Sequence, residues 1–140
     1  MPEVTAEWKD GLEFSVLQDG HEFTIDGSSE YGGHDRGPRP KNLLLAALAG
    51  CTGMDVVSIL SKMRIEDYSL KIIAGGEYTD EHPKVFRNLF IDFVFTGPDL
   101  PRGKLERAVE LSQERYCGVS AMLRHTTEID CTITVNGRKE

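Results

Sequence analysis

The sequence lacks the short motifs that usually mark metal, phosphate and serine-nucleophile sites. Its 140 residues contain no CxxC, HxxxH or HExxH, and the four histidines are scattered along the chain. No glycine-rich loop joins a strand to a helix in the phosphate-binding pattern, and GxSxG is absent. Because preformed sites of these kinds depend on such spacings, we expect no metal and no other cofactor.

Basic residues are also too few and too dispersed to form a patch. Lysine and arginine number 16 against 23 aspartate and glutamate residues, which gives a formal net charge of −7. Binding to nucleic acid or to an anionic membrane surface needs clustered positive charge, so neither partner is expected. The first residues show no basic segment followed by an apolar run, and the cysteine count of three is odd. Both features favour a reducing, cytoplasmic location over a secreted disulfide framework.

The longest apolar run falls short of a clean membrane span. A span needs about 20 mostly apolar residues. The run over residues 43–60 is interrupted by small or polar side chains, namely Gly50, Thr52, Gly53, Asp55 and Ser58. We therefore predict a buried helix of a globular protein, over roughly residues 41–63, beginning after Pro40.

The chain length fits a single domain, 1–140. Alternating apolar residues predict strands over residues 4–9, 12–17 and 22–26, separated by the turn pairs Asp10-Gly11 and Asp19-Gly20. Such pairs favour tight hairpins, so the first part of the chain should form a three-stranded antiparallel meander. A loop rich in glycine and proline follows over residues 27–40.

The second half of the sequence predicts an α+β fold. Two long strands are expected over residues 70–79 and 85–95 and a last strand over 128–135. The second long strand has Leu89, Ile91, Phe93 and Phe95 on one face and Phe86, Phe90 and Val94 on the other. This pattern predicts that both faces are covered, by a helix, a second sheet or another subunit. A helix over residues 103–117 should be amphipathic and end at Gly118, with Ser120 capping a short turn; its buried face should comprise Leu105, Ala108, Val109, Ser112 and Tyr116.

The three cysteines differ in sequence context. Cys131 alternates with isoleucine and valine in a strand, as a small buried apolar residue would. Cys51 lies in the long helix with Asp55 one turn later, and glycines flank it, so packing and chemistry both remain open. Cys117 stands at the end of a helix, where the negative partial charge disfavours a thiolate. Cys117 therefore fits either a packing residue or a thiol that attacks an already oxidised partner.

A reactive Cys51 would need a positive charge nearby. Only the thiolate is nucleophilic, and Asp55 would raise the pKa of the thiol. The helix N-terminus is too distant to help, because its field fades within the first turn. The candidate cations are Lys9 in the meander and Arg36 or Arg39 in the loop.

Two stretches together carry a family resemblance. "RPKNLLLAALAGCTGMDVVSILSKMR" and "QERYCGVSAMLRHTTEI" resemble the two cysteine motifs of the OsmC/Ohr family of thiol-dependent organic hydroperoxide reductases, and the order of elements matches over nearly the whole chain. The likeness is greatest to a less characterised branch of that family. It implies an intertwined homodimer in which antiparallel sheets wrap round two long central helices, whose close approach would account for Gly50 and Gly53.

The resemblance also implies roles for the thiols. Cys51 would be oxidised by an organic hydroperoxide to a sulfenic acid, Cys117 would resolve it as a Cys51–Cys117 disulfide, and a dithiol reductant would restore both. Apolar residues expected around Cys51, such as Leu48 and Met54, favour organic peroxides over hydrogen peroxide.

The chain departs from the family pattern at the charged residues near the thiol. Lys9 stands where the peroxidases carry an arginine, and Lys41 where they carry the glutamate that holds it; Arg36, Arg39 or His34 are the possible substitutes. The alternative hypothesis is a redox-sensing module, or one that binds a small apolar ligand, without efficient peroxidase activity.

Overall fold

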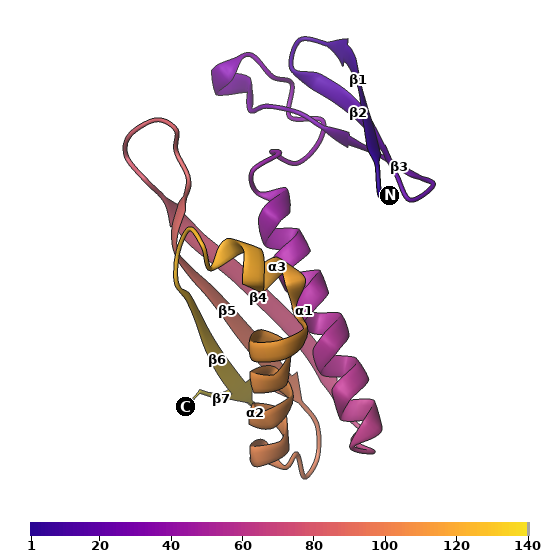
Figure 1. Cartoon of the computed structure of the whole chain (residues 1–140), viewed down its shortest axis with the longest axis vertical. Coiled ribbons are helices and arrows are strands. Elements are labelled where there is room, and N and C mark those ends of the chain that lie inside the picture. Colours follow the sequence, from indigo (N-terminus) through magenta and orange to yellow (C-terminus); the bar gives the residue numbers. More distant parts are fainter. Residues whose placement is uncertain (140) are drawn as a thin grey trace. The chain divides into compact units, whose positions relative to one another are not determined.

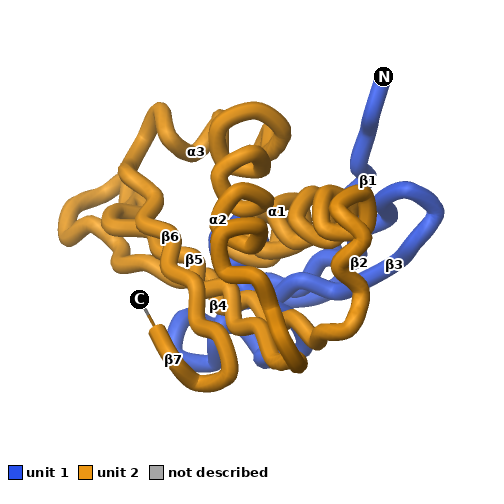
Figure 2. Tube along the Cα trace, turned by 90° about the horizontal axis from the view of Figure 1, so that it is seen from below, with its two compact units in different colours: residues 1–44 blue, residues 45–140 orange. Residues whose placement is uncertain are grey.

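The computed structural model describes residues 1–139 and divides them between two compact units. Residues 1–44 form the first unit, and the second begins at Leu45. Figure 2 distinguishes the two units by colour. Each unit has its own β-sheet.

The first unit is the predicted meander. Strands β1 (Val4–Asp10), β2 (Glu13–Gln18) and β3 (His21–Ile25) pair antiparallel in chain order. Asp19 and Gly20 both have positive φ, 52° and 80°, as a two-residue turn with the twist of a hairpin requires. The turn residues therefore fix the register from the sequence alone, and the prediction is confirmed.

Asp26 organises the loop after β3. Its Oδ1 accepts a hydrogen bond from the N–H of Gly27 at 2.7 Å, and its Oδ2 accepts from the N–H groups of His34 and Arg36 at 3.1 and 3.2 Å. Burial acts to raise the pKa of this carboxyl, but the N–H donors of Arg36, Gly27 and His34 outweigh it and hold the pKa below its usual value of 3.8. One side chain thus closes a loop that includes the 3₁₀ turn η1 (Ser29–Tyr31).

We expect this loop to make the first unit acid-sensitive. The pKa of Asp26 is lower in the folded state than in the unfolded chain. Its contribution to the free energy of unfolding is therefore complete above pH 3.8 and is lost as the pH falls through the folded-state pKa. Asp26→Asn should therefore be less stable than the parent at neutral pH, with the difference narrowing in acid. Fluorescence of Trp8, the single tryptophan, reports on this unit. Asp19→Asn is the control. If the difference in stability between the parent and Asp26→Asn stayed the same across pH 2–7, the role assigned to the Asp26 carboxylate would be wrong.

The second unit is a four-stranded sheet with helices on one face. Strands β4 (Ser69–Tyr78), β5 (Phe86–Thr96), β6 (Ile129–Val135) and β7 (Arg138–Lys139) lie in that order, with β5 and β6 parallel and the other pairs antiparallel. Helices α1 (Leu43–Lys62) and α2 (Arg102–Leu111) lie on the same side of this sheet (Figure 1). The short strand β7 was not predicted.

The core lies between this sheet and the two helices. Leu89, Ile91, Phe93 and Phe95 of β5 are fully buried, as the alternation predicted. They meet one stripe of α1, comprising Leu48, Val56 and Leu60, and the apolar face of α2, comprising Leu105, Ala108 and Val109. Thr52 lies in the α1 stripe and is a fully buried polar residue.

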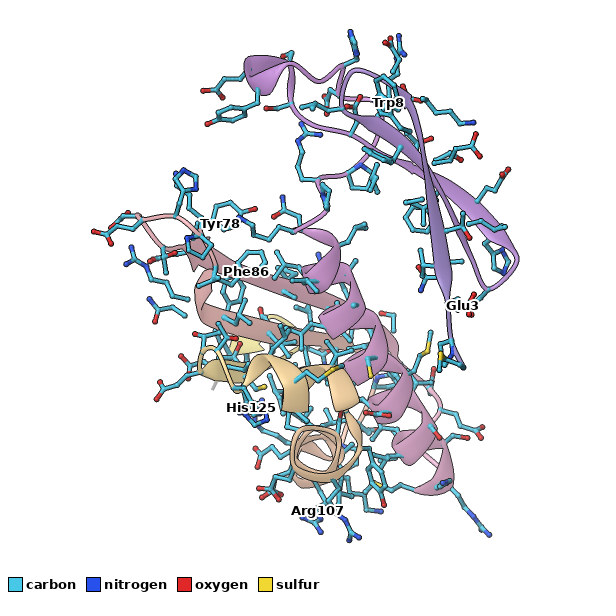
Figure 3. The ribbon with its side chains drawn as sticks, turned by 45° about the horizontal axis from the view of Figure 1, so that its top comes forward. Glu3, Trp8, Tyr78, Phe86, Arg107 and His125 are labelled. Atoms are coloured by element: carbon cyan, nitrogen blue, oxygen red, sulfur yellow. The ribbon has the colours of Figure 1, made fainter. Side chains whose placement is uncertain are left out.

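The other face of β5 is covered only in part within the chain, and cover by another subunit stays a prediction. Asn88 has a φ of +52°, and the pairing with β4 shifts between Gly75 and Glu77. This irregularity breaks the simple alternation, so Phe86 is buried and stacks beside Tyr78 with ring centroids 5.0 Å apart (Figure 3). Farther along the strand Phe90 remains 44 % exposed. The second face is therefore only partly covered within the chain.

The helix before Cys117 also differs from its prediction. α2 ends at Leu111 and continues as a π-helical turn, η2 (Ser112–Tyr116), in which the N–H of Cys117 donates to the carbonyl of Ser112 at 2.7 Å. The wider turn changes the helical phase, so Tyr116 is 57 % exposed instead of buried. Gly118 does not end the helix but begins a new one, α3 (Gly118–Leu123).

Helix α1 has the predicted position, but it is less buried than predicted. Its length and composition would suffice for a membrane span, yet its stripe of Leu48, Thr52, Val56 and Leu60 packs in the second unit. The opposite side is apolar and open, with Met54 76 % and Val57 46 % exposed. Among residues 1–139, the side of α1 that carries Met54 and Val57 is therefore left open.

Candidate active site: a dithiol beside a carboxylate

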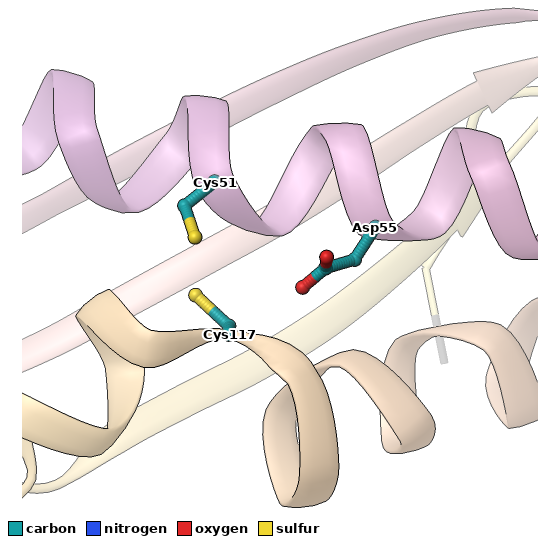
Figure 4. Close-up of side chains that lie close together, drawn as sticks. All are labelled: Cys51, Asp55 and Cys117. Carbon is teal, nitrogen blue, oxygen red and sulfur yellow. The ribbon is translucent and has the colours of Figure 1, made fainter.

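The site joins helix α1 to the junction between η2 and α3. Cys51 and Asp55 lie one turn apart on α1, and Cys117 lies between η2 and α3. The Sγ atoms of the two cysteines and a carboxylate oxygen of Asp55 all lie within 4.8 Å of one another. Figure 4 shows the two sulfur atoms pointing toward each other, with the carboxylate beside them. Both thiols are free, which leaves them able to react as a pair.

Cys117 sits in a pocket of hydrogen-bond donors. As the N-cap of α3, its Sγ accepts a hydrogen bond from the backbone N–H of Ser120 at 3.3 Å. The hydroxyl of Thr52 lies 3.3 Å from the same sulfur. The sequence placed Cys117 at the negative end of a helix, but its sulfur also accepts from the N–H of Ser120 in the next helix. This donor opposes the electrostatic penalty on a thiolate that the helix end imposes.

Gln113 determines which atom donates in the hydrogen bond between the Thr52 hydroxyl and the Cys117 sulfur. A guanidinium can only donate, so the Gln113 Oε1, 2.9 Å from an Arg124 nitrogen, must be the acceptor. The Gln113 Nε2 then donates to Thr52 Oγ1 at 3.2 Å. With its oxygen accepting this bond, Thr52 has its own proton available for the sulfur of Cys117.

The two thiols differ in acidity because their surroundings differ. Burial acts to raise the pKa of Cys117, but hydrogen bonds from Ser120, Thr52 and Cys51 together lower it below the usual value. Burial raises the pKa of Cys51, and the neighbouring Cys117 and the charge of Asp55 raise it further, against the N–H of Val119. The hydrogen-bond donors around Cys117 therefore favour its thiolate, whereas burial and the charge of Asp55 disfavour the thiolate of Cys51.

Asp55 is held by Ser112, a residue that the sequence predicted on the buried face of the helix over residues 103–117. The hydroxyl of Ser112, a fully buried residue, donates to Asp55 Oδ2 at 2.9 Å. Ser112 also contributes the carbonyl that accepts the π-turn hydrogen bond from Cys117. The same residue thus positions both the carboxylate and the second thiol.

Cys131 lies outside this site. It is half-buried on β6, on the same strand face as Ile129 and Ile133, as predicted. Burial raises its pKa to about 11, with smaller effects from Arg124 and Asp130. The thiol therefore stays protonated near neutral pH, which fits an unreactive packing residue.

Each predicted cation of the first unit has a carboxylate partner in that unit. Lys9 Nζ lies 3.0 Å from Glu7. An Arg36 guanidinium nitrogen lies 3.1 Å from Glu13, and one of Arg39 lies 2.8 Å from Asp35. Glu13 is the least exposed of the three carboxylates, and Arg39 is the least exposed of the three cations. The role of these cations beside Cys51 stays a prediction.

The two glycines of α1 have different surroundings. A Cβ on Gly53 would lie 2.8 Å from Cδ1 of Ile72, so packing of α1 on β4 within the chain already favours glycine there. A Cβ on Gly50 would meet nothing within 4 Å. Both glycines line the open groove on α1, so the predicted close approach of a second helix at Gly50 and Gly53 stays a prediction.

Sequence reasoning missed most of the residues around Cys117. Thr52, Gln113, Ser120 and Arg124 lie within the two stretches that resemble the family motifs, but nothing in the sequence pattern indicated that their side chains contact one another around Cys117. The two predicted apolar neighbours of Cys51 differ in exposure. Leu48 is buried in the core, whereas Met54 lines an open groove.

Comparisons with known proteins agree with this architecture. A family model described as OsmC-like protein matches residues 33–132. Protein YhfA of Escherichia coli K12 is 35 % identical over 128 residues, which cover 91 % of this chain and 92 % of that protein. A crystal structure of a hypothetical protein from Aquifex aeolicus VF5 is 32 % identical, with a TM-score of 0.86 over 97 % of this chain and 96 % of that one. The organic hydroperoxide resistance protein OhrB of Bacillus subtilis, 20 % identical, shares the fold with a TM-score of 0.63 over 97 % and 98 % of the two chains.

Proposed function

Because the chain belongs to the family of OsmC-like proteins, we propose that it is a thiol peroxidase that reduces organic hydroperoxides in defence against oxidative stress. The observation that carries the proposal is the facing pair of sulfur atoms, Cys51 and Cys117, brought together from distant parts of the sequence. The chain also shares its fold with solved proteins that are named for organic hydroperoxide resistance.

Access assigns the first step to Cys51. This residue is partly exposed, whereas Cys117 is only 3 % exposed, so a peroxide reaches the sulfur of Cys51 first. The Cys51 proton passes to the Cys117 thiolate, and the Cys51 sulfur attacks the terminal peroxide oxygen. An S–O bond forms, the O–O bond breaks, and the departing alkoxide takes the proton from the Cys117 thiol and leaves as an alcohol, which restores the Cys117 thiolate. Cys51 is thereby oxidised to a sulfenic acid.

The second step uses the donors around Cys117. Once its proton has gone, Cys117 is a thiolate held by Thr52 and Ser120, and it attacks the sulfur of the Cys51 sulfenic acid. The S–S bond forms, the S–O bond breaks, and hydroxide leaves with a proton as water. A dithiol reductant then exchanges with the disulfide and restores both thiols, as the reducing cytoplasm would allow.

The cation that favours ionisation of Cys51 is proposed to come from residues 1–44. Lys9, Arg36 and Arg39 are the candidates, and the guanidinium groups of Arg36 and Arg39 are each held by a carboxylate, at 3.1 and 2.8 Å. A guanidinium held in this way offers a fixed planar donor, which a flexible lysine does not.

The test is oxidation of the reduced protein with one equivalent of peroxide, followed by acid quenching and mass-spectrometric mapping of the cysteines. We expect cumene hydroperoxide to give the Cys51–Cys117 disulfide rapidly, and hydrogen peroxide to give it more slowly. Cys131 should remain reduced with both oxidants. Slow oxidation of all three cysteines at the rate of a free thiol would contradict the proposal.

That contrary result would favour a redox-sensing or ligand-binding module of the same fold. The raised pKa of Cys51, caused by burial, Cys117 and Asp55, is the observation that supports this second candidate. It predicts a small apolar molecule retained through purification, which native mass spectrometry of the protein would detect.

We further propose that the protein is a homodimer joined through the open face of α1. A groove of about 630 Å³ runs along this face, and its lining is mainly apolar: Ala49, Gly50, Gly53, Met54, Val57, Ser58, Leu70 and Ile72. A second copy of the same apolar helix matches it in character, and Gly50 leaves room for close approach.

Light scattering coupled to size-exclusion chromatography tests the dimer. Val57→Lys should yield a monomer, because it places a charge in the apolar interface. Ile73→Lys is the matched control, since Ile73 is 45 % exposed and Val57 46 % exposed, on a strand and a helix respectively. A parent protein that is monomeric, or a Val57→Lys variant that remains dimeric, would contradict the proposed interface.

A further inference from the structure

We infer that the reduced site binds one Zn²⁺ ion through Cys51, Asp55 and Cys117, a capacity that goes beyond the proposed peroxidase. Zinc takes thiolate sulfur at about 2.3 Å and carboxylate oxygen at about 2.0–2.2 Å. In a tetrahedron, these bond lengths place the ligand atoms about 3.5–3.8 Å apart. The three ligand atoms here already lie within 4.8 Å of one another, so small side-chain movements complete the arrangement.

The donor set selects the metal. Two sulfur ligands and one oxygen suit borderline-soft zinc, whereas Mg²⁺ and Ca²⁺ take oxygen ligands almost exclusively. Two thiolates and one carboxylate neutralise the double positive charge of the ion and leave the complex with one net negative charge. A water molecule would take the fourth position, which is typical of zinc sites with three protein ligands.

Residues outside the cluster orient two of the three ligands. Ser112 donates to Asp55 Oδ2 and leaves Oδ1 available for the ion. Ser120 N–H and Thr52 contact the sulfur of Cys117. Bonds of this kind fix ligand geometry in metal sites, and their loss typically costs about 10–100-fold in metal affinity.

A cation can reach the cluster because Cys51 and Asp55 are only partly buried. Binding would displace the thiol protons into solvent and occupy both sulfur atoms. Zinc therefore blocks the dithiol for any other reaction, and formation of the Cys51–Cys117 disulfide removes two of its ligands. Metal binding is confined to the reduced form, and this holds whichever oxidant acts on the site.

The experiment uses Co²⁺ as a spectroscopic probe, followed by Zn²⁺ competition, on the reduced full-length protein without any peroxide. We expect one ion per chain, with the intense visible bands of tetrahedral, thiolate-bound cobalt. Protein oxidised beforehand with diamide, which joins the two thiols, should bind none. The outcome is independent of peroxidase activity, so failure of either proposal can be recognised without the other.

Variants distinguish this site from simple chelation by two thiols. Asp55→Asn keeps an oxygen that can accept from Ser112, and it should weaken zinc binding at least about tenfold. Cys51→Ser and Cys117→Ser should abolish the cobalt bands, whereas Cys131→Ser should bind as the parent does. Equal affinity of parent and Asp55→Asn, or one ion shared by two chains, would overturn the inference. Far-ultraviolet circular dichroism of each variant confirms that it is folded.

Discussion

Cys51→Ser is expected to lose hydroperoxide turnover by at least about a hundredfold, down to the background of an ordinary thiol. A serine hydroxyl cannot form the sulfenic acid that begins the cycle, and the remaining Cys117 is too buried to meet the peroxide. Cys117→Ser should behave differently. It should consume one equivalent of peroxide and then stop, because no thiol remains to resolve the oxidised Cys51.

Measurement of peroxide consumed per chain, with a dithiol reductant present, separates these two outcomes. Cys131→Ser is the control and should turn over like the parent, because its thiol is protonated and lies outside the site. If Cys51→Ser retained parental turnover, the assignment of the first step would be wrong. If Cys117→Ser recycled normally, the reductant would act directly on Cys51, without the disulfide.

Thr52→Val should have the next largest effect, on both stability and the second step. Valine has nearly the shape of threonine but removes the hydroxyl that contacts Cys117 Sγ and accepts from Gln113. The partly buried Nε2 of Gln113 would lose its acceptor in this variant. A buried donor left without a partner costs about 1–3 kcal/mol in the free energy of unfolding. Loss of a hydrogen bond to a thiolate, worth about 1.5–3 kcal/mol, should slow disulfide formation about tenfold or more.

Quenched-flow mass spectrometry can follow the sulfenic acid and the disulfide separately. In Thr52→Val the sulfenic acid of Cys51 should accumulate, because its formation precedes the step that Thr52 assists. Thr52→Ser, which keeps the hydroxyl, is the matched control and should resolve the sulfenic acid at close to the parental rate. Equal rates of disulfide formation in Thr52→Val and the parent would show that Thr52 serves packing alone.

Elements set by local rules were predictable from the sequence. The meander followed from turn pairs such as Asp19-Gly20, whose positive φ angles few other residues adopt. The buried face of β5 followed from alternation, since Leu89, Ile91, Phe93 and Phe95 keep strict two-residue spacing. Helix α1 followed from its apolar composition, with boundaries correct to within two residues.

Where one residue shifts the phase of an element, the predictions failed. Asn88 interrupts the alternation of β5 and changes the environment of Phe86. The π-helical turn does the same after α2, exposing Tyr116 and making Cys117 the cap of α3. Neither irregularity has a sequence signature, because each is stabilised by contacts with elements distant in the chain.

By itself, the sequence determined the elements, the family and the two cysteines worth attention, because turn chemistry, periodicity and paired motifs are local properties. Only the tertiary structure decided what surrounds each thiol. It placed Cys117 beside Cys51 and Asp55, and the hydroxyl of Thr52 beside the sulfur of Cys117. The physical reason is that hydrogen bonds and charges act over a few ångströms in space, whereas these residues are separated along the chain. The acidity of the two thiols therefore depends on how α1 packs against η2 and α3, and no local pattern encodes that packing.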